Sequence, residues 1–438
     1  MPARKRSNQA AKSKAQDSEV GGKKKKLDKP ETQEFSINKD TGHVLVMGQG
    51  DVGQLGLGED IMERKKPGKA KNLDGIEMVQ VECGGMHTVA LTKQGKVYTW
   101  GCNDEGALGR QTSSDDGEEF LPGPVELLND VNVVMVSAGD SHTAALTNNG
   151  IVYAWGTYRD ASGKVGLQPD GAKHRPTVIL TSNEDPIIKI ASGNDHTAAL
   201  SKNGDLLTWG CAEQGQLGRV KECFASRGGR RGLEYILIPK KVRLRKALKF
   251  KDVFCGSYAT FAVDESNVVY AWGLNNYGQL GTGDVENGYL PTRADSLSDL
   301  VVDVDNNHIE IANGQHHTLF LNNTGKVYSL GRADYGRLGI GEGVKESSKP
   351  VHVSSLDGEV ISKIACGEVV SFAVSEKGDV YSWGMGNCLQ LGTGEEDDVH
   401  LPTKVQGKSL QSDTHKVLGV SAGGQHTALL VQEREDGS

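Results

Sequence analysis

The sequence predicts an all-β, seven-bladed propeller, and three observations carry the prediction: a repeat present seven times, the length of its period, and two chain ends that each hold part of one copy. Each copy has a glycine that ends an apolar strand, at Gly48, Gly101, Gly156, Gly210, Gly273, Gly331 and Gly384. A Leu-Gly pair follows within ten residues, except in the third copy, which has Val165-Gly166. The first glycines lie 53 to 63 residues apart, a period typical of propeller blades.

Within each copy, the predicted elements follow in a fixed order. A second glycine, such as Gly84, precedes a strand that opens with His-Thr in five copies, at His87, His142, His196, His317 and His426. Turn pairs such as Asn149-Gly150 indicate a two-residue β-turn to the next strand, which in five copies ends in Trp-Gly. A proline, such as Pro402, then opens a short edge strand, since proline lacks a hydrogen-bond donor. Four strands per blade follow from this order.

The two ends of the repeat predict how the ring closes. Gly42 to Gly48 is the second half of a copy, and Val417 to Val431 is a first half without its Trp-Gly strand. One blade is therefore expected to form jointly from the N- and C-terminal segments. We expect a propeller over residues 42–432 and a disordered acidic tail over 433–438.

The charge is divided unevenly along the chain. Residues 1–33 carry ten Lys or Arg against four acidic residues, a balance of +6 in a chain of net charge −8. We expect residues 1–41 to be a disordered basic arm, either a nuclear localisation and nucleic-acid-binding segment or merely a solubilising tail. Its predicted nuclear localisation clusters are Arg4, Lys5, Arg6, Lys23, Lys24, Lys25 and Lys26.

Several functional classes lack their sequence signals. No apolar run approaches the length of a membrane span, the N-terminus has no secretory signal, and seven cysteines without a Cys-x-x-Cys pair indicate a reducing compartment. Walker, Gly-x-Ser-x-Gly and metal-ligand patterns are missing, so we expect no cofactor and no metal. The sequence favours a protein that binds partners over a hydrolase.

Repetition separates scaffold from candidate site, because a residue type shared by all copies serves the blade and an ionisable residue in one copy does not. The His-Thr histidines are therefore expected to hydrogen-bond a neighbouring strand. The two residues before them change in every copy, and propeller loops of one end converge around the axis. Asp140, Asp195 and His316 are the candidates to contact a partner, with capping of their own turns as the alternative.

A second candidate surface is basic. The longest interval between copies contains a cluster that predicts binding to phosphates or to an acidic protein surface, with a solvated strand edge as the alternative. Its candidate residues are Arg227, Arg230, Arg231, Lys240, Lys241 and Arg243.

The repeat resembles that of the regulator of chromosome condensation family. The resemblance rests on the pattern Gly-x-x-His-Thr…Trp-Gly…Gly-Gln-Leu-Gly and on the segments Gly48 to Gly58, Met62 to Pro67 and Gly101 to Arg110, and it spans residues 42 to 432. It implies a guanine-nucleotide exchange factor for the small GTPase Ran, acting in the nucleus on chromatin and supporting nuclear transport, spindle and nuclear envelope assembly. Implied partners are Ran, the nucleosome's histone acidic patch, DNA and an import receptor. A monomer without membrane contact is expected.

The resemblance also implies roles for individual residues. Exchange-critical GTPase contacts fall on Asp140, Asp195 and His316, and further GTPase-binding residues are Asp51, His87, Asn194, Arg219 and His426. An inserted wedge that pushes on the GTPase's phosphate-binding region corresponds to Thr157, Tyr158, Arg159, Asp160, Ala161, Ser162, Gly163 and Lys164. Plant ultraviolet-B photoreceptors share the repeat but place Trp at the position of Asp140, which excludes that function. A non-catalytic scaffold, or an exchange factor for another GTPase, is the alternative.

Overall fold

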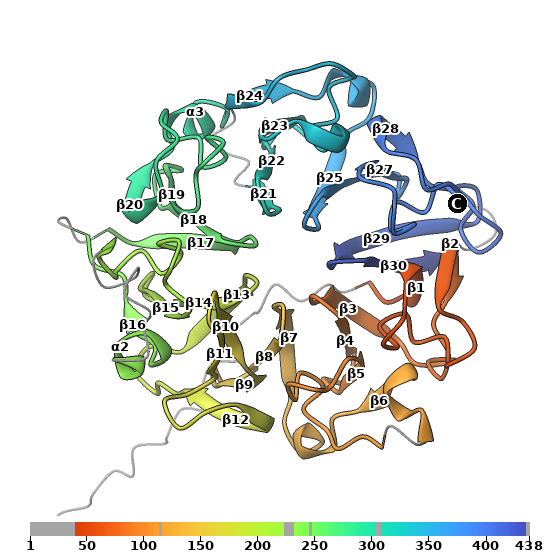
Figure 1. Cartoon of the computed structure of the whole chain (residues 1–438), viewed down its shortest axis with the longest axis horizontal. Coiled ribbons are helices and arrows are strands. Elements are labelled where there is room, and N and C mark those ends of the chain that lie inside the picture. Colours follow the sequence, from red (N-terminus) through yellow and green to blue (C-terminus); the bar gives the residue numbers. More distant parts are fainter. Residues whose placement is uncertain (1–39, 114–115, 223–231, 245–247, 303–307, 435–438) are drawn as a thin grey trace, which may run out of the picture. The chain divides into compact units, whose positions relative to one another are not determined.

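Seven four-stranded antiparallel sheets follow one another around a central axis, which confirms the predicted propeller (Figure 1). The computed structural model describes residues 40–113, 116–222, 232–244, 248–302 and 308–434. The innermost strands contact in sequence, β3 with β7, then β13, β17, β21, β25 and β29, and β29 returns to β3. The ring is therefore closed.

Each blade runs from an inner strand beside the axis to an outer strand, and its strands are named in that order. Blade 1 contains β29 (His415–Ala422), β30 (His426–Glu433), β1 (His43–Gln49) and β2 (Glu63–Lys69). Blade 2 contains β3 (Met78–Cys83), β4 (His87–Thr92), β5 (Val97–Gly101) and β6 (Gly123–Pro124). Blade 3 contains β7 (Val133–Ala138), β8 (His142–Thr147), β9 (Val152–Gly156) and β12 (Lys173–Leu180). Blade 4 contains β13 (Ile187–Ser192), β14 (His196–Ser201), β15 (Leu206–Gly210) and β16 (Lys240–Lys241).

The remaining blades repeat the same order. Blade 5 contains β17 (Phe250–Cys255), β18 (Ala259–Asp264), β19 (Val269–Gly273) and β20 (Gly288–Arg293). Blade 6 contains β21 (Glu310–Asn313), β22 (His317–Leu321), β23 (Val327–Gly331) and β24 (Ser347–His352). Blade 7 contains β25 (Ile361–Cys366), β26 (Val370–Ser375), β27 (Val380–Gly384) and β28 (Val399–Lys404). The hairpin β10 (Tyr158–Asp160) and β11 (Gly163–Gly166) forms a separate two-stranded sheet.

In the described ranges, helical structure is confined to short turns outside the sheets. They are α2 (Leu233–Leu237), α3 (Asp295–Ser298) and the 3-10 turns η2 (Glu118–Phe120), η3 (Glu126–Leu128), η4 (Asp334–Gly336) and η5 (Ser354–Leu356). No helix in the described ranges is long and apolar enough to cross a membrane. The six cysteines in the same ranges are free thiols.

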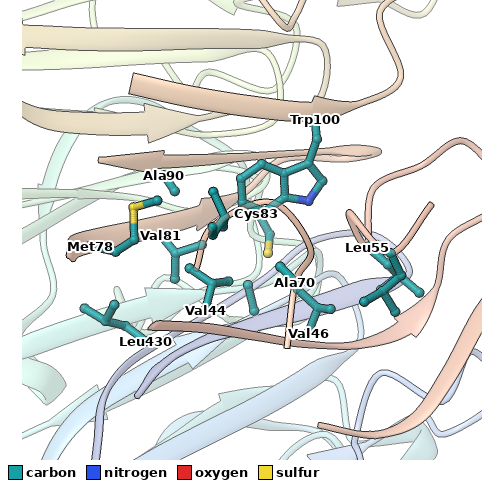
Figure 2. Close-up of a cluster of buried hydrophobic side chains, with 13 residues drawn as sticks. Val44, Val46, Leu55, Ala70, Met78, Val81, Cys83, Ala90, Trp100 and Leu430 are labelled. Carbon is teal, nitrogen blue, oxygen red and sulfur yellow. The ribbon is translucent and has the colours of Figure 1, made fainter. Parts of the chain in front are cut away.

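Blade 1 is built from both ends of the chain, as the sequence predicts. β1 pairs antiparallel with β30, with Val44 opposite Leu430 and Val46 opposite Ala428. Figure 2 shows Val44, Val46 and Leu430 packed in one buried cluster with Trp100 of blade 2. β30 continues to Glu433, and the Arg434 guanidinium donates to three main-chain carbonyl groups, so the expected boundary at 432 falls inside the last strand.

The tryptophans explain why the repeat needs its Leu-Gly pair. All five are fully buried, and the indole N–H of Trp155 donates to the Ala107 carbonyl oxygen of the preceding blade at 2.7 Å. Gly109 lies against that ring: a Cβ there would sit 2.7 Å from the Trp155 Nε1. With a φ of +65°, this glycine meets both a steric and a conformational requirement. Gly56, Gly218 and Gly339 face Trp100, Trp272 and Trp383 in the same way, so for four of the five tryptophans the repeat glycine of the preceding blade makes room for the indole ring.

Two local predictions are wrong in detail. The turns are longer than the two-residue type expected: β8 ends at Thr147 and β9 starts at Val152, and only the glycine of the Asn149-Gly150 pair has a positive φ. Prolines lie in or beside the outermost strands, but five of the seven sit inside the strand, as Pro402 does in β28. The ladder between β27 and β28 is irregular between Ser382 and Gly384, which accommodates a strand residue without an N–H.

Candidate functional site

The loops that join the first and second strands of the blades surround a cavity of about 350 Å³ on the propeller axis. Asp140, Asn194, Ser257 and Glu368 line it, each from this loop of a different blade. Main-chain hydrogen bonds link neighbouring loops: the Asp140 N–H donates to the Asn194 carbonyl oxygen at 2.7 Å, and the Asn194 N–H donates to that of Ser257 at 3.1 Å. The loops that vary most in the repeat therefore converge at the axis.

Asp140 lies close enough to Asp195 to affect the ionisation of the Asp195 carboxyl group. Burial, and then the charge of Asp140, raise the pKa of Asp195 from 3.8 to about 7. Burial also raises the pKa of Asp140, and the pKa of Glu368 is raised by burial and by Asp140. Glu368 is absent from the sequence-derived candidates although its position in the variable loop meets the same criterion. The three carboxyl groups form a partly desolvated acidic cluster suited to a cationic partner.

His316 belongs to a different neighbourhood, between blades 5 and 6. Its Nδ1 lies 3.2 Å from the Asn276 Oδ1, and its ring meets that of Tyr277 edge-on at 5.1 Å. Burial and the charges of Arg337 and Arg332 lower the pKa of His316 to about 4, so the imidazole is neutral at pH 7. It can therefore offer a hydrogen bond to a partner but no positive charge.

The predicted wedge is the β10–β11 hairpin, inserted after β9 of blade 3. Tyr158, at its base, is fully buried, and its hydroxyl lies 3.0 Å from the Thr197 Oγ1 of blade 4. The Arg159 N–H donates to the Asp195 Oδ1 at 2.7 Å. Of the exchange-critical candidates, Asp195 thus contacts the wedge directly.

The histidines that begin the second strands connect adjacent blades, as expected. Nε2 of His87 lies 2.8 Å from the Thr143 hydroxyl, and Nε2 of His426 lies 2.8 Å from that of Thr88. Both rings are at most 1% exposed, and burial lowers their pKa values to about 4 and about 3. The direct GTPase contact that the resemblance implies for His87 and His426 is therefore not available to these side chains in this structure.

Three other GTPase-binding candidates lie in distinct settings. The Arg219 guanidinium donates to the carbonyl oxygens of Thr208 and Tyr235, and these bonds connect the blade-4 loop to strand β15. Burial lowers the pKa of Arg219 to about 10. Asn194 lines the axial cavity. Asp51 is exposed in the loop after β1.

The basic candidates are only partly within the described residues. Lys240, Lys241 and Arg243 are exposed; Lys241 forms an ion pair with Asp205 at 2.5 Å, and the Lys240 ammonium lies 4.6 Å from the ring centre of Tyr235. Arg227, Arg230 and Arg231 lie outside the described residues, as do the N-terminal arm with its localisation clusters and residues 435–438 of the tail. Among the residues described, no His, Cys, Asp and Glu group is arranged to hold a metal ion.

The fold and the site together define a seven-bladed propeller that presents acidic loops and an inserted hairpin at one end of its axis. The RCC1-like domain family matches residues 43–429. The chain belongs to the regulator of chromosome condensation family.

Individual relatives agree over nearly the whole chain. The regulator of chromosome condensation of Homo sapiens is 50% identical over 405 residues, covering 91% of this chain and 93% of the relative. The guanine nucleotide exchange factor SRM1 of Saccharomyces cerevisiae is 32% identical, covering 87% and 86%. The crystal structure of S. cerevisiae Prp20p, described with its binding to Gsp1p and histones, matches with a TM-score of 0.80 at 31% identity, over 92% of this chain and 94% of Prp20p. Prp20 bound to Kap60 matches with a TM-score of 0.81 at 30% identity, over 96% and 97%.

Proposed function

We propose that this chain is a guanine-nucleotide exchange factor for the small GTPase Ran. The observation that carries the proposal is the contact between Asp195 and the wedge: a desolvated acidic cluster and an inserted hairpin are joined at one site. The relatives support it, because one of them is named an exchange factor and another is described as binding Gsp1p.

Exchange of this kind involves no covalent chemistry. A protein that binds the nucleotide-free GTPase more tightly than the loaded form weakens nucleotide binding by the same factor, about tenfold per 1.4 kcal/mol of differential binding. Asp140 and Asp195 engage cationic groups of the GTPase, and neutral His316 adds a hydrogen bond. The wedge enters the phosphate-binding region and displaces the contacts that hold phosphates and metal.

The candidates whose side chains bind other parts of the propeller take supporting roles in this mechanism. His87 and His426 fix neighbouring blades to each other, and Arg219 fixes the blade-4 loop, so each holds part of the GTPase-facing surface in place. Asn194 and Asp51 are the remaining candidates for direct contact.

Chromatin association is the second part of the proposal. The exposed cations Lys240, Lys241 and Arg243, together with the basic arm and Arg227, Arg230 and Arg231, bind DNA and the acidic patch of the core histones, and an import receptor binds the arm and carries the protein into the nucleus. Support comes from the solved relatives, described with histones and with Kap60.

The test is release of labelled GDP from Ran under excess unlabelled nucleotide, with the wild-type chain, Asp195→Ala and a deletion of residues 159–164. We expect rapid release with the wild type and a large loss with both variants. Full activity of both variants would refute the assigned site. Release from another small GTPase but not from Ran, or from none, would favour the alternative exchange factor or scaffold.

A further inference from the structure

Glu105 stands out because it contacts both cations of the wedge. Its carboxylate pairs with the Arg159 guanidinium at 3.0 Å and with the Lys164 ammonium at 2.7 Å. The side chain is only 14% exposed, whereas those of Arg159 and Lys164 are 43% and 58% exposed. A largely, though not fully, buried carboxylate in blade 2 thus pairs with both strands of a hairpin that belongs to blade 3.

The blade scaffold does not require an acid at this position. Glu105 directly precedes the glycine Gly106 of its turn, and six turns of the repeat have this position. The other five carry Val52, Gln214, Tyr277, Tyr335 and Cys388. Glu105 is the only carboxylate among these six residues, so the reasoning that selects Asp140 and Asp195 from single copies selects Glu105 as well.

The wedge needs such a contact for two physical reasons. A two-stranded hairpin of three- and four-residue strands is not stable by itself, so neighbouring blades must fix its position. Arg159 and Lys164 are also direct cross-strand partners, and like charges facing each other across a strand pair destabilise it. One carboxylate between them offsets this repulsion.

Contacts from blade 4 complete the arrangement on the other side of the hairpin. The Asp195 carboxylate accepts the Arg159 N–H, and the Glu213 Oε2 accepts the Ala161 N–H at 3.0 Å. Each of these bonds fixes a single main-chain amide of β10 or the turn. Glu105 alone, among the described residues, forms ion pairs with both strands.

We propose that Glu105 is a positioning residue for nucleotide exchange. It holds β10 and β11 together and fixes the orientation of the wedge on the propeller before the GTPase binds. This inference rests on the proposed exchange function and adds a residue to it. Because the wedge acts after encounter, loss of Glu105 lowers the maximal rate of nucleotide release more than the affinity for the GTPase. In this inference, the wedge that Glu105 holds in place contacts the phosphate-binding region of a nucleotide-loaded GTPase.

The test compares Glu105→Gln, which keeps the shape and removes the charge, with Asp104→Asn, which removes an exposed carboxylate from the same loop. Amide hydrogen exchange of residues 158–166 in the free protein reports the wedge, and GDP release from Ran at varied concentration reports function. Two partly exposed ion pairs correspond to roughly a five- to tenfold effect. For Glu105→Gln we expect a roughly five- to tenfold decrease in the hydrogen-exchange protection of the wedge and in the maximal rate of GDP release. The half-saturation concentration should stay within about twofold of the wild-type value. Asp104→Asn should match the wild type in all three measurements.

A further variant separates charge repulsion from general damage. Lys164→Gln added to Glu105→Gln removes one of the two facing cations and is expected to restore part of the wedge protection. Wild-type protection of the wedge in Glu105→Gln, or a loosened wedge with an unchanged maximal rate, would overturn the inference. If the wild-type chain released no GDP from Ran, the proposed function would fail, and hydrogen exchange would still decide whether Glu105 holds the wedge.

Discussion

Replacing Asp195 with asparagine tests whether the ionised Asp195 carboxylate lowers the stability of the fold while it serves the binding of a partner. The carboxyl group has its pKa raised from 3.8 to about 7 by burial and by Asp140. Each pKa unit corresponds to about 1.36 kcal/mol, so ionised Asp195 lowers the free energy of unfolding by up to about 4 kcal/mol. Asparagine keeps the oxygen that accepts the Arg159 N–H and carries no charge.

The sign of the pH dependence follows from proton uptake. Between pH 4 and pH 7 the folded protein keeps a proton on Asp195 that the unfolded chain has lost, so the contribution of this group to stability is fully present below about pH 4 and declines as the pH rises to about 7. Asp195→Asn removes this decline. We expect the variant to be more stable than the wild type at pH 8 by up to about 4 kcal/mol, and by only about 1 kcal/mol at pH 4.5.

Urea unfolding followed by tryptophan fluorescence at both pH values measures this difference. Asp104→Asn serves as the control, because it removes an exposed carboxylate and should follow the wild-type curve at both pH values. A variant at Asp195 that is less stable than the wild type at pH 8, or a stability difference that is the same at pH 4.5, would refute the electrostatic reasoning. If Asp195→Asn is more stable than the wild type and also releases GDP from Ran more slowly, then Asp195 serves function and lowers the free energy of unfolding of the wild-type protein.

Three further predictions concern closure, packing and the basic surface. Deletion of residues 416–431 removes most of β29 and of β30, so the propeller should be destabilised and should unfold less cooperatively in calorimetry; unchanged cooperative unfolding would refute the role of the two chain ends in closing blade 1. Gly109→Ala combines a φ of +65° with a Cβ only 2.7 Å from the tryptophan of blade 3, and should lower the free energy of unfolding by about 2 kcal/mol or more, whereas Gly419→Ala, which meets open space, should not. Glutamine at three exposed cations should weaken duplex DNA binding and reduce the slope of log affinity against log salt by about 1 to 3; binding that is insensitive to salt would contradict the electrostatic account. These cations are Lys240, Lys241 and Arg243.

Much of the fold could be predicted because the repeat reports it seven times. The period, the Trp-Gly strand ends and the split copy at the two termini define the number of blades, the inter-blade packing and the closure of blade 1. Turn geometry and strand boundaries were predicted less well. The β-turn expected at Asn149-Gly150 and the strand start expected at Pro402 both depend on local backbone conformation, which a residue pair does not determine.

The candidate site was harder to predict because burial is not visible in the repeat. His87 and His426 match the family pattern, yet their rings lie between blades. Arg219 looks like a free cation in the sequence, and its guanidinium is used by main-chain carbonyl groups. Conversely, Glu105 and Glu368 pass the single-copy criterion and could have been found by applying it to every turn.

The most direct test of the proposed mechanism measures GDP release from Ran with a wedge deletion, Asp195→Ala and the two changes combined. If Asp195 acts through both the GTPase and the wedge, each change should greatly lower the maximal rate, and the combined loss should be smaller than the product of the single losses because the two sites share one interaction. Wild-type release rates in either single variant would contradict the claim that this acidic cluster and this hairpin act together in nucleotide exchange.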